Sequence, residues 1–457
     1  MSAPVAPVPV GPLRLTLRNR FPGQFLWRTM GDMLRSVELL GETADDLASV
    51  KTITGRHLVL AKHPDLVREV LVVQAKALRK GLGLQRTKVT LGNGLLTSEG
   101  EFHLRQRRLA QPAFHRDRIA GYAATMVALA ERDAASWQDG QRFDVARAMH
   151  HLTLDIVAKT LFDADLRGQA AELGTALTQV LDSFSVLLII VGDRMYDWPT
   201  PRMRRVRRAI PVLDAAILGL VADRRREGGD RGDLLSMLLA ARDEEGDGTG
   251  MTDRQLRDEL MTIFLAGHET TANALAWTWW FLAQHPEVEA RLHEELDRVL
   301  AGRAPTMADV PALPYTRAVF SESLRLRPPA YATTREAVDE VVLDGQRIPA
   351  GSQVMVSPWV TQRDPRWWTD PLRFDPDRWV PGRDEPRHKH AFFPFGGGTR
   401  VCIGEQFAWT EGILLIASIA RQWRLALTVP ATSITPKAAI TLRPFPGVPV
   451  VAHRRRS

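Results

Sequence analysis

The chain has 457 residues, and its 60 Lys and Arg outnumber its 53 Asp and Glu, which gives a formal net charge of +7. The single cysteine excludes internal disulfides and cysteine-based zinc clusters and indicates a reducing compartment, so we expect a cytoplasmic protein. The arginines are spread along the sequence without a nucleic-acid-binding motif, so we expect no nucleic-acid partner. Every apolar run is too short to span a bilayer, and we expect no membrane anchor.

The first hundred residues show helical patterns on either side of a hairpin. Residues 24–40 and 65–73 have apolar side chains at helical spacing. Residues 49–60 alternate as a strand does, with the turn of the predicted hairpin at Gly55. The glycine-rich segment 77–94 has no clean period, so the sequence predicts a loop there.

A basic helical stretch follows, and two of its side chains share one face. His103 and Arg107 are four residues apart, which places them one turn apart on a helix. Two donors at this spacing suit a ligand that carries two carboxylates. An ordinary solvated basic face is the alternative for such a pair.

Helical patterns fill the middle of the chain. The expected helices cover residues 119–137, 146–162, 170–190, 202–226 and 252–284. The last of these is the longest uninterrupted pattern in the sequence.

The centre of that longest helix reads Ala266-Gly267-His268-Glu269-Thr270-Thr271. A glycine there costs about 1 kcal/mol relative to alanine, so it needs a reason. Small residues at Ala266 and Gly267 would let a ligand lie against the backbone, and Thr270 can donate a hydrogen bond to the Ala266 carbonyl. Glu269 beside Thr270 provides an acid and a hydroxyl for moving protons. The alternative is a packing glycine and a threonine bonded within its own helix.

A later helix carries Glu322 and Arg325, which are three residues apart and can pair on one face. A surface pair of this kind contributes only about 0–1 kcal/mol, so the spacing alone is weak evidence of a special role. Pro328 ends this helix.

The last part of the chain contains strand patterns. Residues 338–357 read as strands, and Asp344-Gly345 is typical of a two-residue hairpin turn. Residues 425–429 and 438–451 predict further short strands near the C-terminus.

Residues 392–404 read Phe-Phe-Pro-Phe-Gly-Gly-Gly-Thr-Arg-Val-Cys-Ile-Gly and contain Cys402. Consecutive glycines let the backbone approach a flat ligand closely. A helical pattern begins after Cys402, and we expect amide N–H groups and the positive helix end to lower the pKa of its thiol. A thiolate presented in this way suits a haem iron as an axial ligand. A lone cysteine is otherwise most often a small buried apolar residue.

The order Phe395, Gly398, Arg400, Cys402 and Gly404 resembles the haem-binding signature of the cytochrome P450 family. The resemblance covers most of the chain, because the helix-centre motif and both spaced pairs above also match the family. It implies a mainly α fold, with a large helical part and a smaller β-rich part. One domain would then cover residues 1–457, with an irregular segment at residues 1–20.

The resemblance also implies roles for individual residues. Cys402 would be the iron ligand of haem b, and Glu269 and Thr270 would be the catalytic pair that delivers protons. The other residues implied to contact the haem are His103, Arg107, Arg335, Arg400, Phe395, Ala266 and Gly267. A structural trio would comprise Glu322, Arg325 and Arg378. The residues implied to line the substrate pocket are Phe264, Leu265, Ala330, Tyr331 and Phe445.

The activity implied by the resemblance is that of a monomeric, anchor-free bacterial monooxygenase. It would insert one atom of O2 into a C–H bond of a hydrophobic substrate, a terpenoid, carotenoid or fatty acid. Electrons would come indirectly from NAD(P)H through a ferredoxin and its reductase, because the chain shows no flavin or iron–sulfur segment. A peroxide-driven haem oxygenase and a non-catalytic haem sensor are the alternatives, and the Glu269–Thr270 pair argues against both.

Overall fold

The structure is a computed structural model, and it describes residues 10–30, 32–163, 170–184, 191–243, 248–380 and 388–455. Residues 10–20 form little regular structure beyond the two-residue strand β1 (Gly11–Pro12). Residues 1–9, the rest of the segment expected to be irregular, lie outside the described part.

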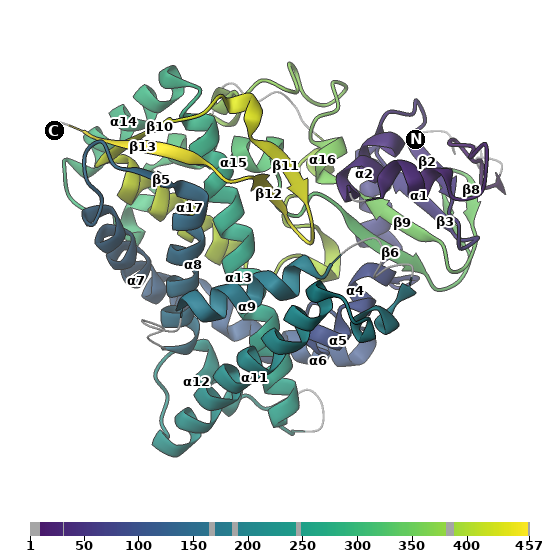
Figure 1. The fold of residues 1–457 in the computed structure, drawn as a ribbon, viewed down its shortest axis with the longest axis horizontal. Helices are drawn as coiled ribbons and strands as arrows, with labels where there is room; N and C mark the ends of the chain where they lie inside the picture. Colours follow the sequence, from purple (N-terminus) through teal and green to yellow (C-terminus); the bar gives the residue numbers. More distant parts are fainter. Residues whose placement is uncertain are drawn as a thin grey trace, which may run out of the picture.

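Helices make up most of the molecule and surround one long central helix, α13 (Figure 1). The helices are α1 (Gln24–Thr29), α2 (Met33–Gly41), α3 (Pro64–Arg68), α4 (Leu82–Arg86), α5 (Lys88–Leu91), α6 (Gly100–Ala110), α7 (Arg116–Ala135), α8 (Val145–Phe162), α9 (Ala170–Asp182), α11 (Pro201–Glu227), α12 (Leu234–Ala240), α13 (Asp253–Leu282), α14 (Pro286–Leu300), α15 (Pro314–Leu326), α16 (Pro358–Thr361) and α17 (Glu405–Ala420).

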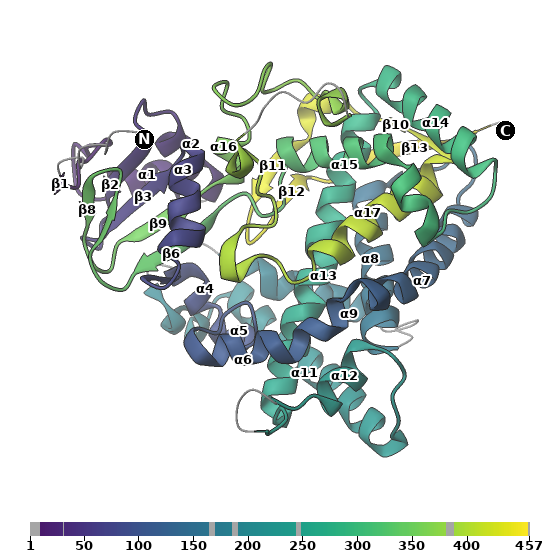
Figure 2. The same cartoon turned by 180° about the vertical axis from the view of Figure 1, so that it is seen from behind.

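The strands of the described residues form four sheets, two of which lie at the N-terminal side of the molecule, while β10, β13 and β5 lie near the C-terminus (Figures 1 and 2). The largest sheet has the order β2-β3-β9-β6-β4, in which only the β3–β9 pair is parallel. Its strands are β2 (Leu47–Lys51), β3 (His57–Ala61), β9 (Gln353–Val356), β6 (Thr333–Ala337) and β4 (Leu78–Lys80).

Three smaller sheets complete the β structure of the described residues. Their orders are β1-β8-β7, β10-β13-β5 and β11-β12. Their strands are β7 (Val341–Leu343), β8 (Gln346–Ile348), β5 (Arg142–Asp144), β10 (Trp423–Leu427), β13 (Pro449–Arg454), β11 (Thr435–Ala438) and β12 (Leu442–Phe445).

The main apolar core lies among the helices, with α13 packed against α8, α15 and α17. Trp277 near the C-terminal end of α13 is fully buried, and its indole N–H donates to the Leu442 carbonyl of β12 at 3.0 Å. Two smaller apolar clusters fill the β-rich part. The longest predicted helix is therefore the axis on which the rest of the chain packs.

Local sequence signals account for several element ends. Thr252 and Gln255 form a reciprocal capping box at the start of α13. Asp344 and Gly345 both have positive φ angles, as the predicted two-residue turn between β7 and β8 requires. These ends depend on neighbours in sequence, and that is why the sequence predicts them.

Two expectations about the N-terminal part are wrong. The single helix predicted over residues 24–40 is two helices, α1 and α2, and Asp32 caps the second with its side chain. The loop predicted over residues 77–94 contains β4, α4 and α5. β4 is stabilised by antiparallel pairing with β6, more than 250 residues later in the chain, a contact that local periodicity does not encode.

Candidate active site

The loop before α17 is held in shape by its glycines and by backbone hydrogen bonds. Gly398 has a φ of +67°, and a Cβ there would lie 2.1 Å from the Leu71 carbonyl oxygen, so any other residue would collide. The Cys402 amide donates to the Phe395 carbonyl at 3.0 Å. The Phe395 ring packs against Trp409 of α17 at a centroid distance of 5.5 Å. The loop therefore presents Cys402 from a fixed backbone.

The Cys402 thiol is solvent-accessible although it lies deep in the protein. Burial raises its pKa to about 11, while the Gly404 amide hydrogen bond and the Arg107 charge act in the opposite direction. The expectation of a lowered pKa is thus wrong for the protein without a metal, because desolvation outweighs the helix end. Metal coordination would deprotonate this thiol outright.

Basic side chains gather beside this loop, and the structure adds Lys80 of β4 to those expected. Burial, together with the charges of Lys80, Arg400 and Arg107, lowers the pKa of His103 to about 3. Burial and the charge of Arg400 lower the pKa of Arg335 to about 10. Burial lowers the pKa of Lys80 to about 7. We call Lys80, His103, Arg107, Arg335 and Arg400 the basic cluster.

The hydrogen bonds of the basic cluster leave capacity for an anion. The Nε2 atom of His103 is buried without a partner, while its Nδ1 lies 3.4 Å from the Lys80 Nζ. Arg107 donates to the Val401 carbonyl at 2.9 Å, which ties α6 to the cysteine loop. Arg400 pairs with the Glu99 carboxylate at 2.6 Å. Positive charge exceeds this one paired carboxylate, so the residues present fit the carboxylates of a haem.

Lys80 could not have been found from the sequence. It lies in a segment predicted to be a loop, so no face was available on which to place its side chain. In the structure its Nζ donates to the carbonyls of Leu95 and Ser98 at 2.8 and 2.7 Å.

The centre of α13 is partly accessible although the helix around it is buried. Ala266 is exposed, and the Thr270 hydroxyl donates to its carbonyl at 2.7 Å, the hydrogen bond expected from the sequence. Gly267 is different, because a Cβ there would lie 3.0 Å from Val157 of α8. A side chain at 267 would enter the interface between α13 and α8. The structure therefore gives Gly267 a packing role, and its place beside the cofactor stays a prediction.

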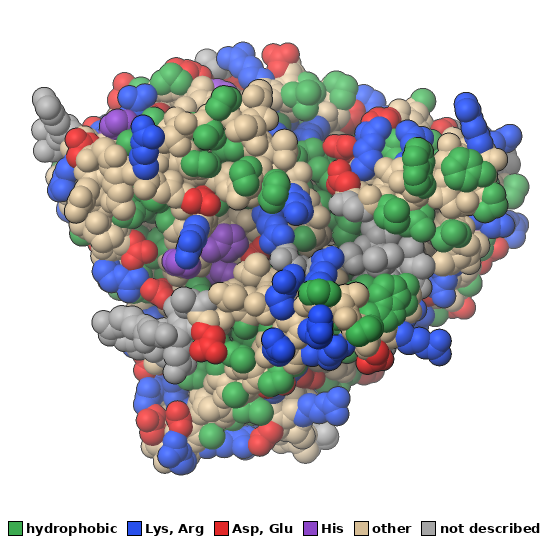
Figure 3. Space-filling model, viewed as in Figure 1, with side chains coloured by type: hydrophobic (Ala, Val, Ile, Leu, Met, Phe, Trp, Pro, Cys, Tyr) green, Lys and Arg blue, Asp and Glu red, His purple; other side chains and the backbone are tan. Residues whose placement is uncertain are grey.

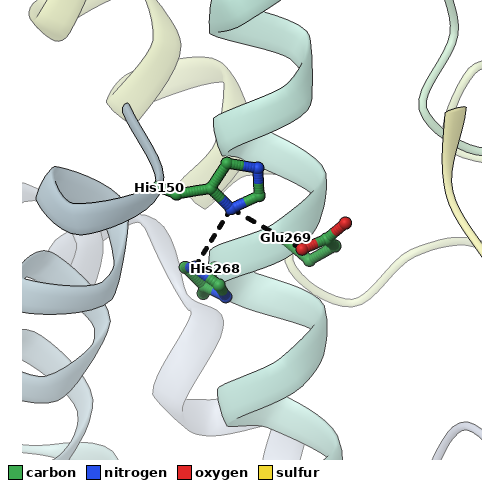
Figure 4. A group of neighbouring side chains, drawn as sticks. All are labelled: His150, His268 and Glu269. Atoms are coloured by element: carbon green, nitrogen blue, oxygen red, sulfur yellow. Dashed lines mark hydrogen bonds and ion pairs between the residues drawn. The ribbon is translucent and has the colours of Figure 1, made fainter. Parts of the chain in front are cut away.

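The Glu269 carboxylate is buried between α13, α8 and the turn before β12. Its Oε1 accepts hydrogen bonds from Asn273 Nδ2 and Thr441 Oγ1, both at 2.9 Å. Its Oε2 lies 3.6 Å from His150 Nδ1, and His150 in turn lies 3.3 Å from His268 (Figure 4). Sequence reasoning missed His150, whose place beside Glu269 depends on how α8 packs on α13.

Most residues expected in the substrate pocket are packed in apolar cores. Phe264 and Leu265 are buried in the helical core, and Tyr331 is buried in the β-rich part, where its hydroxyl donates to the Ala439 carbonyl at 3.1 Å. Phe445 is 49% exposed, and the Lys437 ammonium lies over its ring. Ala330 is accessible. The structure therefore shows core contacts of Phe264, Leu265 and Tyr331 and places Phe445 beneath a lysine, and the substrate pocket of these residues stays a prediction.

The expected structural trio is brought together, and it is more deeply buried than a surface pair. Glu322 and Arg325 are both fully buried, and Arg325 Nη2 lies 2.8 Å from Glu322 Oε1. Arg378 Nε lies 2.9 Å from the same oxygen, and Trp379 Nε1 donates to Glu322 Oε2 at 2.9 Å. We call Glu322, Arg325 and Arg378 the buried trio.

None of the helices in the described part of the chain combines the length and the apolar character needed to cross a membrane.

Comparisons with known proteins agree with this fold. A family model described as Cytochrome P450 matches residues 14–447. Cyclooctatin synthase of Streptomyces melanosporofaciens is 42% identical over 86% of this chain and 85% of its own. Cyclooctat-9-en-7-ol 5-monooxygenase of the same organism is 39% identical over 90% of this chain and 88% of its own. The crystal structure of the cytochrome P450DA heme domain matches with a TM-score of 0.87 and 28% identity, covering 98% of this chain and 99% of that one.

These matches confirm the predicted family, the predicted fold class and the predicted kind of enzyme. The chain belongs to the cytochrome P450 family, and it is a monooxygenase.

Proposed function

We propose that the protein binds haem b through Cys402 and hydroxylates a C–H bond of a hydrophobic, terpenoid-type substrate. The observation that carries the proposal is a thiol that is accessible and yet surrounded by protein, beside a cluster of basic groups. When bound, the haem would supply dioxygen activation and oxygen transfer, for which side chains alone have no suitable chemistry.

The basic cluster would bind and orient the cofactor through its carboxylates. His103 has a buried Nε2 without a partner, and Arg335 is buried with a lowered pKa. A carboxylate beside these groups would form charge-assisted hydrogen bonds and restore the stability of their charged forms. Arg107 donates a hydrogen bond to the backbone of the cysteine loop, so it would hold the thiol in a fixed position relative to the cofactor.

On the α13 side, Ala266 would leave space beside the helix, and the Thr270 hydroxyl would hold a proton there. This hydroxyl currently donates to the Ala266 carbonyl. Glu269 is adjacent in sequence, but its carboxylate is bonded toward Asn273 and Thr441. Proton movement between Glu269 and Thr270 would therefore need a bridging water or a turn of the Glu269 side chain.

The substrate class rests on the relatives and on the accessible alanine at position 330. One relative is named for an oxygenation of cyclooctat-9-en-7-ol, by its name an unsaturated alcohol. We propose a similar substrate class here, and we propose a ferredoxin and its reductase as electron donors from NAD(P)H. Screening terpenes, fatty acids and steroids for substrate-induced changes in the haem spectrum would identify the class. A response to fatty acids alone would reject terpenoids.

The test of the haem ligand is the variant Cys402→Ala. The reduced, carbon monoxide-bound wild type should show the Soret band of a thiolate-ligated haem, and the variant should lose this band and the hydroxylation activity. Circular dichroism of both proteins separates loss of the ligand from loss of the fold. A thiolate-type band that persists in Cys402→Ala would refute the assignment.

A further inference from the structure

A histidine from another helix connects the buried Glu269 carboxylate to the protein surface. His150 of α8 has a side chain that is 26% exposed, whereas that of Glu269 is 7% exposed. Figure 3 shows histidine side chains at the surface near the place where Figure 1 draws α8. His150 is therefore the partner of Glu269 that solvent can reach.

The hydrogen bonds of His150 orient its ring toward Glu269. Its Nε2 lies 3.3 Å from Asn273 Oδ1, an acceptor, which favours a proton on Nε2. Its Nδ1 lies 3.3 Å from His268 Nε2 and 3.6 Å from Glu269 Oε2 (Figure 4). A second proton on the ring would therefore be placed on Nδ1, the atom that faces the carboxylate.

His268 does not compete for that proton. It is buried in α13, and burial together with the charges of His150 and His151 lowers its pKa to about 3. Of the two imidazoles, His150 is therefore the one that can exchange a proton with solvent, since its side chain is 26% exposed.

The charges around His150 come from three helices. His268 and Glu269 face it from α13, and His151 is its neighbour on α8. The charges of Arg147 and Asp155 of α8 and of Asp133 of α7 act on His151. Glu269 has the closest carboxylate to His150 among these groups, so it is the group that a proton on Nδ1 would face.

We propose that His150 is a relay residue that carries protons from solvent to Glu269 during the oxygenation reaction. The proton leaves His150 Nδ1 and binds Glu269 Oε2, and the imidazole is left neutral with its proton on Nε2. The ring then takes a new proton from water by turning about its Cβ–Cγ bond, a torsion with a broad energy profile. This inference rests on the proposed function, in which Glu269 passes protons toward Thr270.

The test compares His150→Gln with the matched control His151→Gln, since His151 is exposed on the same helix. His150→Gln should lower the fraction of NAD(P)H electrons that appear in product by about 10-fold or more, with the remainder appearing as hydrogen peroxide. The control should stay at the wild-type value. Equal coupling in both variants would overturn the relay.

A second measurement reads the same contact without turnover. In the ferrous, carbon monoxide-bound holoenzyme, the nitrogen NMR resonance of His150 Nδ1 should shift in Glu269→Gln, because this atom faces the Glu269 carboxylate. An unchanged resonance would overturn the proposal. If the wild type makes no product from any substrate while this shift is present, the proposed function fails and the His150–Glu269 coupling stands.

The same three side chains have donor atoms within 4.8 Å of one another, which is close enough for them to share a metal ion. The existing hydrogen bonds of Glu269 and His150 to Asn273 favour the relay instead. Stoichiometric zinc in the purified holoenzyme, lost in His150→Gln and retained in His151→Gln, would overturn the relay in favour of a metal site.

Discussion

The buried trio and the basic cluster are both made of charged side chains removed from solvent, but they differ in how their hydrogen-bonding groups are satisfied. In the trio, Arg325 donates to both Glu322 oxygens and to the carbonyls of Gln362, Pro371 and Arg373 at 2.7 to 3.1 Å. In the cluster, the His103 Nε2 atom has no partner, and burial lowers the pKa of Lys80 to about 7.

This difference separates a structural ion cluster from a ligand site. Carboxylate and backbone oxygens accept the guanidinium hydrogen bonds of the trio, which ties α15 to the segment that precedes the cysteine loop. The cluster holds an excess of positive charge and a buried nitrogen that folding alone leaves without an acceptor or donor partner. Burial is common to both, so it is the unpartnered buried atom beside the positive charge that indicates an anionic ligand.

The largest effect on stability should come from removing the single carboxylate of the trio. Glu322→Gln removes its carboxylate while keeping its shape, and it leaves Arg325 and Arg378 buried together. We expect the free energy of unfolding in urea to fall by about 3–5 kcal/mol. Glu340→Gln is the matched control, because Glu340 pairs with Arg347 at the solvent-exposed surface. This substitution should lower the free energy of unfolding by only about 0–1 kcal/mol. An equal decrease in the free energy of unfolding in both variants would show that the Glu322 carboxylate does not stabilise the two buried arginines.

A smaller effect should come from the cluster, and it should appear in cofactor retention. Arg335→Met removes one charge-assisted hydrogen bond, worth about 1.5–3 kcal/mol, so the rate of haem loss should rise about 10- to 100-fold. Transfer of haem to an acceptor protein measures this rate. Arg79→Met, on the exposed side of β4 and paired with Glu336, is the control. Faster haem loss from the control alone would place the cofactor contact elsewhere.

The smallest effect is a pH dependence of the haem-free protein caused by Lys80. The pKa of Lys80 is about 7 in the folded protein, whereas the ordinary value of 10.5 applies to the unfolded chain. The unfolded chain therefore binds more protons than the folded protein does between pH 7 and pH 10.5. The free energy of unfolding should therefore rise with pH above 7, and between pH 7 and pH 8 the rise should be about 1 kcal/mol. Lys80→Met should flatten the rise.

Haem binding supplies the control for this titration. Cofactor carboxylates near Lys80 would raise its pKa, and the slope of the wild type should become smaller in the holoenzyme. Urea unfolding at a series of pH values measures both slopes. A slope that is the same in wild type and Lys80→Met would remove Lys80 from the basic cluster.

Local sequence determined the features that depend on neighbours along the chain. The glycine loop around Cys402, the hydrogen bond from Thr270 to Ala266, the hairpin turn at Asp344 and the long central helix all follow from spacing and backbone preference. The resemblance carried by these motifs gave the family and the kind of enzyme, which the comparisons confirm.

Tertiary structure alone decided the features that join distant segments. It placed Lys80 beside His103, His150 beside Glu269, and Val157 against Gly267. It also reversed the expected direction of the Cys402 pKa, because burial depends on the whole fold and outweighs the helix end. Spacing along a helix or strand governs only the nearest turns, whereas desolvation and contacts between helices depend on how the entire chain packs.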